Sequence, residues 1–430
     1  MPFTDFALHP LLLKALEADG YTEPTPIQAA AIPPALAGRD LLGTAQTGTG
    51  KTAAFLLPTL NRLAEGKQPR PAGAPRILVL APTRELAHQV LLAARKYGQF
   101  LQLTTGELVG GMPYREQLRM LSRPVDLVVA TPGRLQDHMQ RGRLHLAGVE
   151  VLILDEADRM LDMGFLEAVE SIAAACGKDR QTLLFSATLD RRMAKLAERL
   201  LSNPVRVAAA ETAEAAPRIE QRLCHADDLA HKRRLLHHFA QSPDVGKAVV
   251  FTATKRGADT LARELTAAGH SVGALHGDMT QDNRNRTLDQ LRRSQIRLLV
   301  ATDVAARGID VRDITHVINF DLPRGPEDYV HRIGRTGRAG AEGIAISFVA
   351  HGERDLLARI QHFTKVAITA HQVVGLEPRR PIAANPGRTG APPSGKNRGG
   401  AGKSWARPGR RTTSQQQGHG PRKQASAASR

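Results

Sequence analysis

The sequence is poor in the residues that hold small extracellular domains together. It has two cysteines, Cys176 and Cys224, among 430 residues, and neither belongs to a pattern with metal-ligand spacing. Two isolated cysteines cannot build a disulfide framework, and they suit a reducing compartment. We therefore expect neither a structural disulfide nor a zinc site, and we expect a cytoplasmic protein.

Long apolar runs are also missing. Near the start of the chain, Leu11-Leu12-Leu13 is soon followed by Lys14 and Glu17, so this run is too short and too charged for a signal or membrane segment. No other stretch approaches the roughly 20 apolar residues that a membrane-spanning helix needs. The sequence predicts no membrane partner.

Acidic residues are absent from the end of the chain. Residues 378–430 contain 12 Lys and Arg but no Asp or Glu, so residues 1–377 keep only +5 of the net charge of +17. This stretch is rich in Pro, Gly, Ser and Gln, and its one aromatic residue is Trp405. Such a composition cannot bury enough apolar surface to fold. We expect a disordered basic tail over residues 377–430 that binds nucleic acid, the alternative being a solubility tail without a fixed partner.

Short apolar runs, by contrast, are plentiful and fall into two groups. Each run is followed by a polar or helical stretch, which predicts two parallel α/β sheets. Between the groups, Val207–Pro217 lacks a hydrophobic stripe. We expect domains over residues 1–207 and 218–376 and a flexible linker over residues 208–217. The expected strands are 41–42, 76–81, 108–111, 126–130, 151–154 and 181–185 in the first group and 248–251, 271–275, 297–301, 316–320 and 343–348 in the second.

Two strands of the first group end in residues typical of a nucleotide site. Leu41-Leu42 precedes Ala45-Gln46-Thr47-Gly48-Thr49-Gly50-Lys51-Thr52, in which glycines would let backbone N–H groups surround phosphate, with Lys51 adding charge and Thr52 a ligand for Mg²⁺. The general phosphate-loop pattern has Gly where this chain has Ala45. A second strand, Val151–Leu154, ends in Asp155, Glu156 and Asp158, at the edge where open α/β sheets bind ligands. Together these features predict a nucleoside triphosphatase.

Three other strand ends in the first group carry small or basic residues, Pro82-Thr83-Arg84, Gly110-Gly111 and Thr131-Pro132-Gly133-Arg134. Small residues let a polymer backbone approach, and arginine binds phosphate. Each stretch alone could be an ordinary turn. Because all three would lie on one side of one sheet, they favour a nucleic-acid track.

The second group has no phosphate loop but ends in charged residues. Arg335 and Arg338 could donate positive charge in trans to the first site, as arginines do in phosphoryl transfer. A metal site at His225, His231, His237 and His238 is the weaker interpretation of another stretch, because Lys232-Arg233-Arg234 would repel a cation.

Asp155-Glu156-Ala157-Asp158 is the box that names the DEAD-box RNA helicases, and the chain resembles this family from Phe3 to about residue 350. Residues 158–165 and the basic tail resemble bacterial members of the SrmB and RhlE type, which implies a role in ribosome assembly or RNA turnover. The matching segments, in the family's order, are Gly20–Gln28, Ala45–Thr52, Pro82–Leu86, Gly110-Gly111, Thr131–Arg134, Asp155–Asp158, Ser186–Thr188, Val250–Thr254, Gln281–Arg284, Ala301–Asp310 and His331–Arg338.

The resemblance implies two RecA-like domains that bind ATP, Mg²⁺ and RNA together and couple ATP hydrolysis to local unwinding of RNA. It implies that Tyr21 and Gln28 read adenine, residues 45–52 hold the phosphates, Thr52 and Asp155 hold Mg²⁺ (Asp155 through water), and Glu156 activates the attacking water. Asp310 would contact the ribose and Arg335 and Arg338 the γ-phosphate, while Ser186, Thr188, Asp158 and His331 would couple hydrolysis to RNA release. The implied RNA contacts are Pro82, Thr83, Arg84, Gly111, Thr131, Gly133, Arg134, Gly277, Gln281, Arg284, Thr302 and Asp303.

Two alternative functions use the same motifs. One is an ATP-gated clamp that stays on RNA and recruits partners such as pre-ribosomal particles or the RNA-decay machinery. The other is a DNA helicase. Contacts to sugar and phosphate carry little sequence information, so selectivity for RNA would come from the 2′-hydroxyl.

Overall fold

The computed structural model describes residues 2–45, 48–66, 70–208, 219–306, 311, 313–337 and 341–379. Several residues with expected roles lie outside this set: Gln46, Thr47, Asp310, Arg338, the linker residues 209–217 and the basic tail from residue 380 onward.

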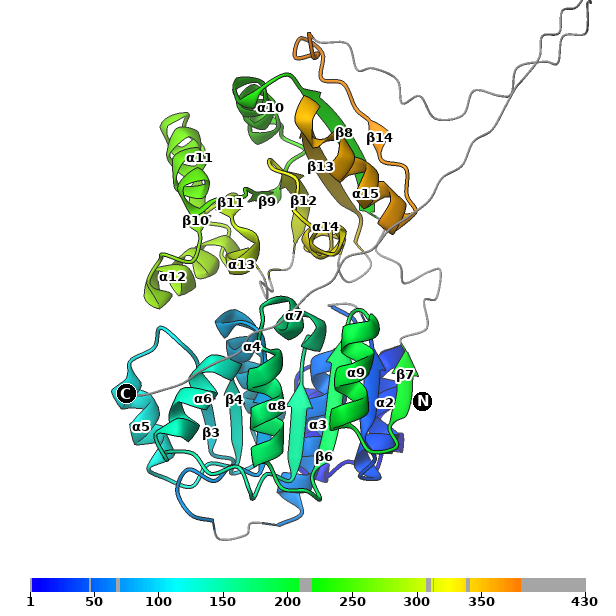
Figure 1. The fold of residues 1–430 in the computed structure, drawn as a ribbon, viewed down its shortest axis with the longest axis vertical. Helices are drawn as coiled ribbons and strands as arrows, with labels where there is room; N and C mark the ends of the chain where they lie inside the picture. The colour runs from blue at the N-terminus through cyan, green and yellow to red at the C-terminus, as the bar shows by residue number, and fades with distance from the viewer. Residues whose placement is uncertain are drawn as a thin grey trace, which may run out of the picture. The chain divides into compact units, whose positions relative to one another are not determined.

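The first sheet has seven parallel strands in the order β3-β4-β2-β5-β6-β1-β7. Figure 1 labels β3, β4, β6 and β7 of this sheet. In β2, Ile77 and Val79 belong to one hydrophobic core while Leu78 and Leu80 belong to the other. Strands that are apolar on both faces are typical of a sheet covered by helices on both sides. The strands are β1 Leu41–Thr44, β2 Ile77–Leu80, β3 Thr105–Leu108, β4 Leu127–Ala130, β5 Val151–Leu154, β6 Gln181–Ser186 and β7 Val205–Ala208.

Helices cover both faces of this sheet. The short helix η1 Phe3–Asp5 and helices α1 Pro10–Ala18, α2 Pro26–Leu36, α3 Lys51–Ala64 and α4 Arg84–Tyr97 pack into the core on one face. Those that pack into the other core are α5 Tyr114–Leu121, α6 Pro132–Gln140, α7 Ala157–Asp162, α8 Leu166–Ala175 and α9 Arg191–Leu200.

The second sheet repeats the topology of the first. Its order is β10-β11-β9-β12-β13-β8-β14, which matches the first sheet strand for strand. Its strands, again all parallel, are β8 Ile219–Ala226, β9 Lys247–Phe251, β10 Val272–Leu275, β11 Leu298–Ala301, β12 Ile314–Asn319, β13 Gly343–Ala350 and β14 Thr369–Ala370. Its helices are α10 Leu229–Gln241, α11 Lys255–Ala267, α12 Gln281–Arg292, α13 Asp303–Ala306, α14 Pro326–Ile333, η2 His351–Glu353 and α15 Arg354–Thr364.

The expected fold class, two parallel α/β sheets in tandem, is confirmed. Strands β7, β8 and β14 were not predicted from the sequence. Strand β8 mixes polar and apolar residues, and its pairing with all eight residues of β13 is a long-range interaction that no local pattern announces. Among the described residues, no helix is long and apolar enough to cross a membrane.

The packing of β1 on β6 gives a stability test. A Cβ at Gly43 would lie 2.5 Å from the ring of buried Phe185 on the neighbouring strand. We predict that Gly43→Ala lowers the free energy of unfolding by about 1–3 kcal/mol, because a core that is already filled must shift to accommodate a methyl group. Gly66→Ala is the matched control, since no atom of the described residues lies within 4 Å of its added Cβ. Urea unfolding followed by circular dichroism measures both variants, and equal midpoints would contradict this packing.

Candidate functional site

The strand order sorts the expected site residues into two halves of one sheet edge. Because all strands of the first sheet are parallel, their carboxyl ends share an edge. Strands β5, β6 and β1 are consecutive there, and so are β3, β4 and β2. Of the expected site residues that follow strands of this sheet, those for nucleotide follow β1, β5 and β6, and those for a polymer follow β2, β3 and β4.

Lys51 begins α3 in the nucleotide half. It follows Gly48 and Gly50, whose φ values of 90° and 94° are in the left-handed region that glycine adopts without strain. The Lys51 side chain is buried, and its Nζ atom has no hydrogen-bond partner among the described residues. A buried ammonium group without a partner is costly unless an anion binds to it.

Two buried carboxylates follow β5. Asp155 is 2% exposed and Glu156 is 3% exposed. Glu156 caps α7 with φ 52° and ψ 52°, a left-handed conformation that strains a residue other than glycine. Asp155 Oδ1 and Glu156 Oε2 accept no hydrogen bond within the described residues. Unfilled carboxylate oxygens and backbone strain both occur typically at functional sites.

The two carboxylates have opposite pKa shifts. Burial raises the pKa of Asp155 to about 6, against the attraction of Lys51, and the negative charge of Glu156 adds to the increase. Burial also opposes ionisation of Glu156, but the positive charges of Arg159, Lys51, Arg335 and His331 hold its pKa below the usual value. The structure thus places the expected trans residue Arg335, together with His331, within electrostatic reach of Glu156.

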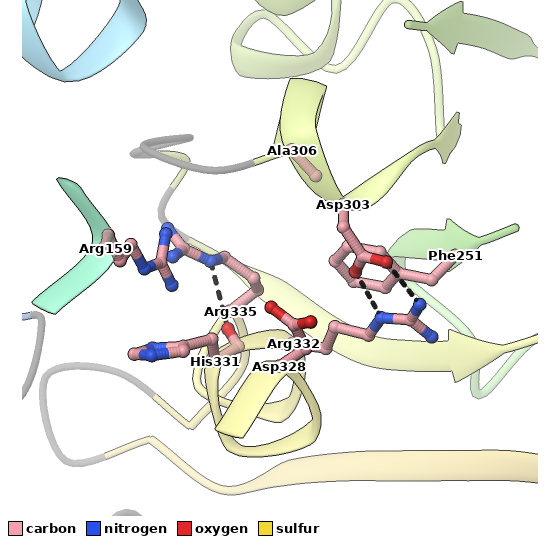
Figure 2. Close-up of a pocket in the computed structure, with 8 residues that line it drawn as sticks. All are labelled: Arg159, Phe251, Asp303, Ala306, Asp328, His331, Arg332 and Arg335. Atoms are coloured by element: carbon pink, nitrogen blue, oxygen red, sulfur yellow. Dashed lines mark hydrogen bonds and ion pairs between the residues drawn. The ribbon is translucent and has the colours of Figure 1, made fainter. Parts of the chain in front are cut away.

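Arg159 is a site residue that the sequence analysis missed. Its Nη1 atom lies 3.4 Å from Glu156 Oε2, and its side chain is 2% exposed. The signal was present in the sequence, because residues three apart on a helix lie on the same face. Arg159 also lines a small pocket with His331, Arg332 and Arg335 (Figure 2).

Gln28 contacts the phosphate loop. Its Nε2 donates to the carbonyl oxygen of Gly50 (3.1 Å), and its Oε1 accepts from the Thr25 backbone N–H (2.9 Å). The Thr25 hydroxyl donates to the Thr49 carbonyl (2.8 Å). The side-chain amide expected to read adenine is thus already bonded within the protein, where it braces the loop. Tyr21 packs edge-to-face on Tyr97, with ring centroids 5.9 Å apart.

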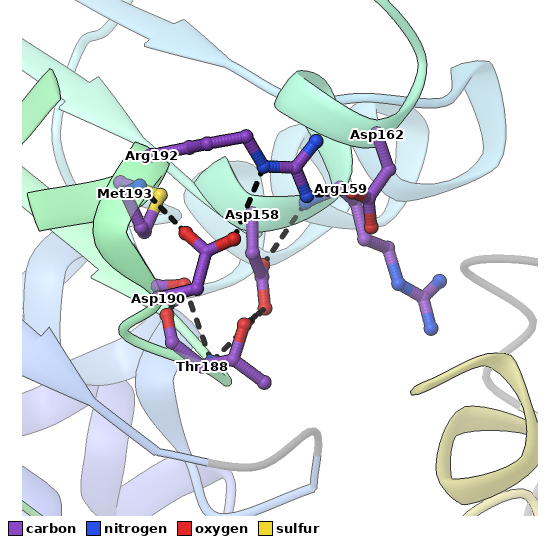
Figure 3. Close-up of polar contacts among 8 residues, drawn as sticks. Asp158, Arg159, Asp162, Thr188, Asp190, Arg192 and Met193 are labelled. Carbon is purple, nitrogen blue, oxygen red and sulfur yellow. Dashed lines mark hydrogen bonds and ion pairs between the residues drawn. The ribbon is translucent and has the colours of Figure 1, made fainter. Parts of the chain in front are cut away.

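The acidic strand end and the end of β6 are joined by hydrogen bonds (Figure 3). Asp158 Oδ2 accepts from the backbone N–H groups of Ala187 (3.1 Å) and Thr188 (3.0 Å) and from the Thr188 hydroxyl (3.1 Å). The Ser186 hydroxyl donates to the Thr188 carbonyl (2.6 Å). A movement of Asp158 would therefore move the residues after β6, and a movement of those residues would move Asp158.

In the other half of the edge, the Arg84 side chain lies against the glycine turn after β3. Gly111 has φ 77°, and a Cβ there would overlap the Arg84 guanidinium group. Arg84 Nη1 also lies 3.4 Å from Gln281 Oε1 of α12. The structure therefore brings together three of the residues expected to bind RNA.

Arg284 has a different environment from the one expected. It forms an ion pair with buried Glu85, 2.5 Å between Nη2 and Oε1, and Nη1 donates to the His276 carbonyl (3.1 Å). The guanidinium group is buried and paired with Glu85. It therefore fixes the orientation of α12 and does not offer an unpaired positive charge.

The remaining expected polymer contacts of the first sheet differ in burial. Thr83 and Thr131 occupy the N-cap positions of α4 and α6, and both are buried together with Pro82. A Cβ added at Gly133 would meet no atom of the described residues within 4 Å. Arg134 donates to the Met112 carbonyl (3.5 Å).

On the second sheet, Gly277 and Thr302 follow the neighbouring strands β10 and β11. The carboxylate of Asp303, another expected RNA contact, accepts hydrogen bonds of 2.5 and 2.7 Å from Arg332 (Figure 2). Arg332 is buried and also donates to the Asn319 side chain (3.1 Å). This pairing ties α13 to α14.

Comparisons with known proteins agree with this geometry. A family model of the DEAD/DEAH box helicases matches residues 25–196, and a model of the helicase conserved C-terminal domain matches residues 231–340. The ATP-dependent RNA helicase SrmB of Haemophilus influenzae is 47% identical over 378 residues, which are 88% of this chain and 86% of that protein. This chain is a DEAD-box helicase. SrmB of Escherichia coli is 46% identical over 88% of this chain and 85% of its own length.

Solved structures of other DEAD-box helicases share the fold. The S. cerevisiae protein Dbp5 bound to RNA and ADP BeF3 superimposes with a TM-score of 0.75 at 33% identity, covering 86% of this chain and 95% of Dbp5. The helicase Mss116 bound to ssRNA and UDP-BeF superimposes with a TM-score of 0.78 at 28% identity, covering 89% of this chain and 80% of Mss116. The predicted family and its tandem RecA-like domains are confirmed.

The nucleotide half of this DEAD-box helicase fits ATP with a divalent cation. Lys51 Nζ offers an unpaired positive charge at a helix N-terminus, which suits phosphate. Asp155 Oδ1 is an unpaired hard oxygen beside it, which suits Mg²⁺.

The brace formed by Gln28 gives a second test. A Cβ at Gly50 would overlap Gln28 Nε2 and lie 2.9 Å from the Thr25 hydroxyl, whereas one at Gly48 would meet no atom within 4 Å in the part of the chain that the structure describes. Both glycines have positive φ, so Gly50→Ala and Gly48→Ala share a backbone strain of about 1–2 kcal/mol. We predict that Gly50→Ala lowers the thermal midpoint of the nucleotide-free protein more than Gly48→Ala does. Equal losses would show that Gln28 does not fill this space.

Proposed function

We propose that this DEAD-box helicase hydrolyses ATP when it is bound to RNA and uses the cycle to separate short RNA duplexes or remodel RNA–protein particles. The observation that carries the proposal is the buried set Lys51, Asp155 and Glu156, in which Lys51 Nζ, Asp155 Oδ1 and Glu156 Oε2 have no hydrogen-bond partner among the described residues. Such a set is stabilised when a nucleotide and its metal ion fill it, and it lies on the same edge as the glycine and arginine track.

Different residues of the nucleotide half would bind the phosphates, hold Mg²⁺ and act on the attacking water. Backbone N–H groups of residues 46–50 and the Lys51 ammonium would bind the phosphates, and Thr52 and Asp155 would hold Mg²⁺. Bound Mg²⁺ would neutralise charge on the phosphate oxygens. Glu156, held as a carboxylate by the surrounding cations, would orient the attacking water through a hydrogen bond and accept its proton as general base.

Groups from the second sheet would complete this site. Arg335, whose charge already acts on Glu156, would stabilise the γ-phosphate together with Arg338. Asp310 would bind the ribose. Tyr21 and Gln28 would contact adenine, and Gln28 would transmit its position to the phosphate loop through Gly50.

Coupling to RNA would pass along the first sheet edge. Ser186, Thr188 and Asp158 form one hydrogen-bonded unit, and His331 lines the pocket that also includes Arg159. Loss of the γ-phosphate would change the hydrogen bonds of this unit and make the loops after the neighbouring strands more mobile.

The RNA backbone would lie along the half edge made by β3, β4 and β2. Phosphates would be held by Arg84 and Arg134 and by backbone groups near the glycines and helix N-termini. Arg284 would act by orienting α12 through Glu85. The other proposed RNA contacts are Pro82, Thr83, Gly111, Thr131, Gly133, Gly277, Gln281, Thr302 and Asp303.

We further propose that the protein is cytoplasmic and that its functional domains span residues 1–207 and 218–376. Its substrates would be precursor ribosomal particles. The support is the similarity to SrmB and the basic tail. Sequencing of RNA crosslinked to the protein in cells tests this, and recovery of messenger RNA fragments without ribosomal precursors would contradict it.

Glu156→Gln tests the proposed catalytic role. The amide keeps the size of the side chain but cannot accept a proton, so we predict ATP and RNA affinities close to wild type and a turnover reduced by about 10²–10⁴-fold. The measurement is ATPase rate with saturating single-stranded RNA, with DNA of the same sequence as a comparison. Wild-type turnover in the variant would refute the role of Glu156, and equal stimulation by DNA would refute RNA specificity.

Removal of the basic tail tests its proposed binding to RNA. A protein ending at Glu377 loses 12 positive charges and no negative ones. We predict that it keeps its maximal ATPase rate but needs more RNA, and that the log–log dependence of RNA affinity on salt becomes shallower by about 0.7 for each lost phosphate contact on single strands. Unchanged affinity and slope would leave only a solubility role.

A further inference from the structure

A buried glutamine holds the glycine turn after β3. Gln117 of α5 is 2% exposed. Its Nε2 donates to the carbonyl oxygens of Val109 (3.1 Å) and Met112 (3.4 Å). These two residues flank Gly110-Gly111, so one side-chain amide bonds the turn on both sides.

His138 of α6 fixes the orientation of this amide. Because Gln117 Nε2 donates to the two carbonyls, Oε1 is left to accept, and His138 Nε2 lies 3.2 Å from it. His138 is fully buried and stacks on the Tyr114 ring, with centroids 4.5 Å apart and an interplanar angle of 6°. Burial lowers the pKa of His138, which favours the neutral ring. Because Gln117 Oε1 can only accept, its contact with Nε2 selects the tautomer with the proton on that nitrogen.

The same cluster reaches Arg134. The Arg134 guanidinium group donates to the Met112 carbonyl (3.5 Å), the oxygen that Gln117 also bonds, and lies 5.6 Å from the centre of the Tyr114 ring. The glycine turn and Arg134 come from adjacent strands, β3 and β4. They are therefore held to each other through Gln117, His138 and Tyr114.

We propose that Gln117 and His138 are positioning residues for RNA binding, which hold the Gly110-Gly111 turn and Arg134 in register so that both contact the same RNA backbone. The inference rests on the proposed function, since it assumes that RNA lies on this half of the edge. Neither residue reaches an open surface, so each acts through the groups it bonds.

Gln117→Glu separates positioning from packing. The carboxylate has the shape of the amide but no N–H group, so it would repel the carbonyl oxygens of Val109 and Met112. We expect the RNA concentration for half-maximal ATPase to rise about ten-fold, as loss of one or two buried hydrogen bonds implies. We expect the affinity for an ATP analogue without RNA to stay within two-fold of wild type. Gln140→Glu is the matched control, with the same charge change at the exposed end of α6.

A second pair of variants decides the matter if Gln117→Glu does not fold. His138→Leu removes the donor to Gln117 and should weaken RNA binding, whereas His138→Gln keeps an N–H donor and should restore most of it. A lower thermal midpoint with unchanged RNA dependence would make the cluster purely structural and overturn the inference. Wild-type protein that RNA does not stimulate would instead overturn the proposed function.

Discussion

Parallel strand direction is the constraint on which the rest of this structure depends. Because all seven strands of each sheet run the same way, every loop after a strand lies at one edge. The strand order then decides which loops are neighbours. The phosphate loop after β1, the carboxylates after β5 and Ser186 at the end of β6 form one half, while the loops after β2, β3 and β4 form the other. A nucleotide and a polymer can thus bind the same edge without competing for it.

The two halves meet at the β2–β5 pair, where the Leu154 end of β5 lies beside Leu80 of β2. In the nucleotide half, the buried charged side chains and the left-handed backbone conformation of Glu156 are energetically unfavourable when no ligand is bound. In the polymer half, buried Gln117 bonds the turn after β3, and buried Glu85 at the start of α4 pairs with Arg284. Because the two halves adjoin at β2 and β5, a ligand that stabilises the nucleotide half would act next to the loops of the polymer half, which suits coupling between nucleotide state and RNA affinity.

The sequence predicted the parts of this arrangement that are local. The apolar run Val151–Leu154 followed by acid, and the glycine-rich loop before Lys51, are short-range patterns that indicate a strand end and a phosphate site. Pairings distant in sequence could not be predicted in this way. The bond from Gln28 to Gly50 spans 22 residues, and the pair Glu85–Arg284 spans 199. For the same reason the partner of Asp303, Arg332, was missed, and so was polar-rich β8, which needs β13 to be a strand.

Hydrogen exchange measured by mass spectrometry tests the division of the edge most directly. An unhydrolysed ATP analogue alone should slow exchange in residues 45–52, 155–158 and 186–188, because backbone groups there would be covered or held more firmly. Single-stranded RNA alone should slow exchange in residues 82–86, 109–113 and 131–134. Protection of the phosphate loop by RNA alone, with the turn after β3 unaffected, would contradict the account.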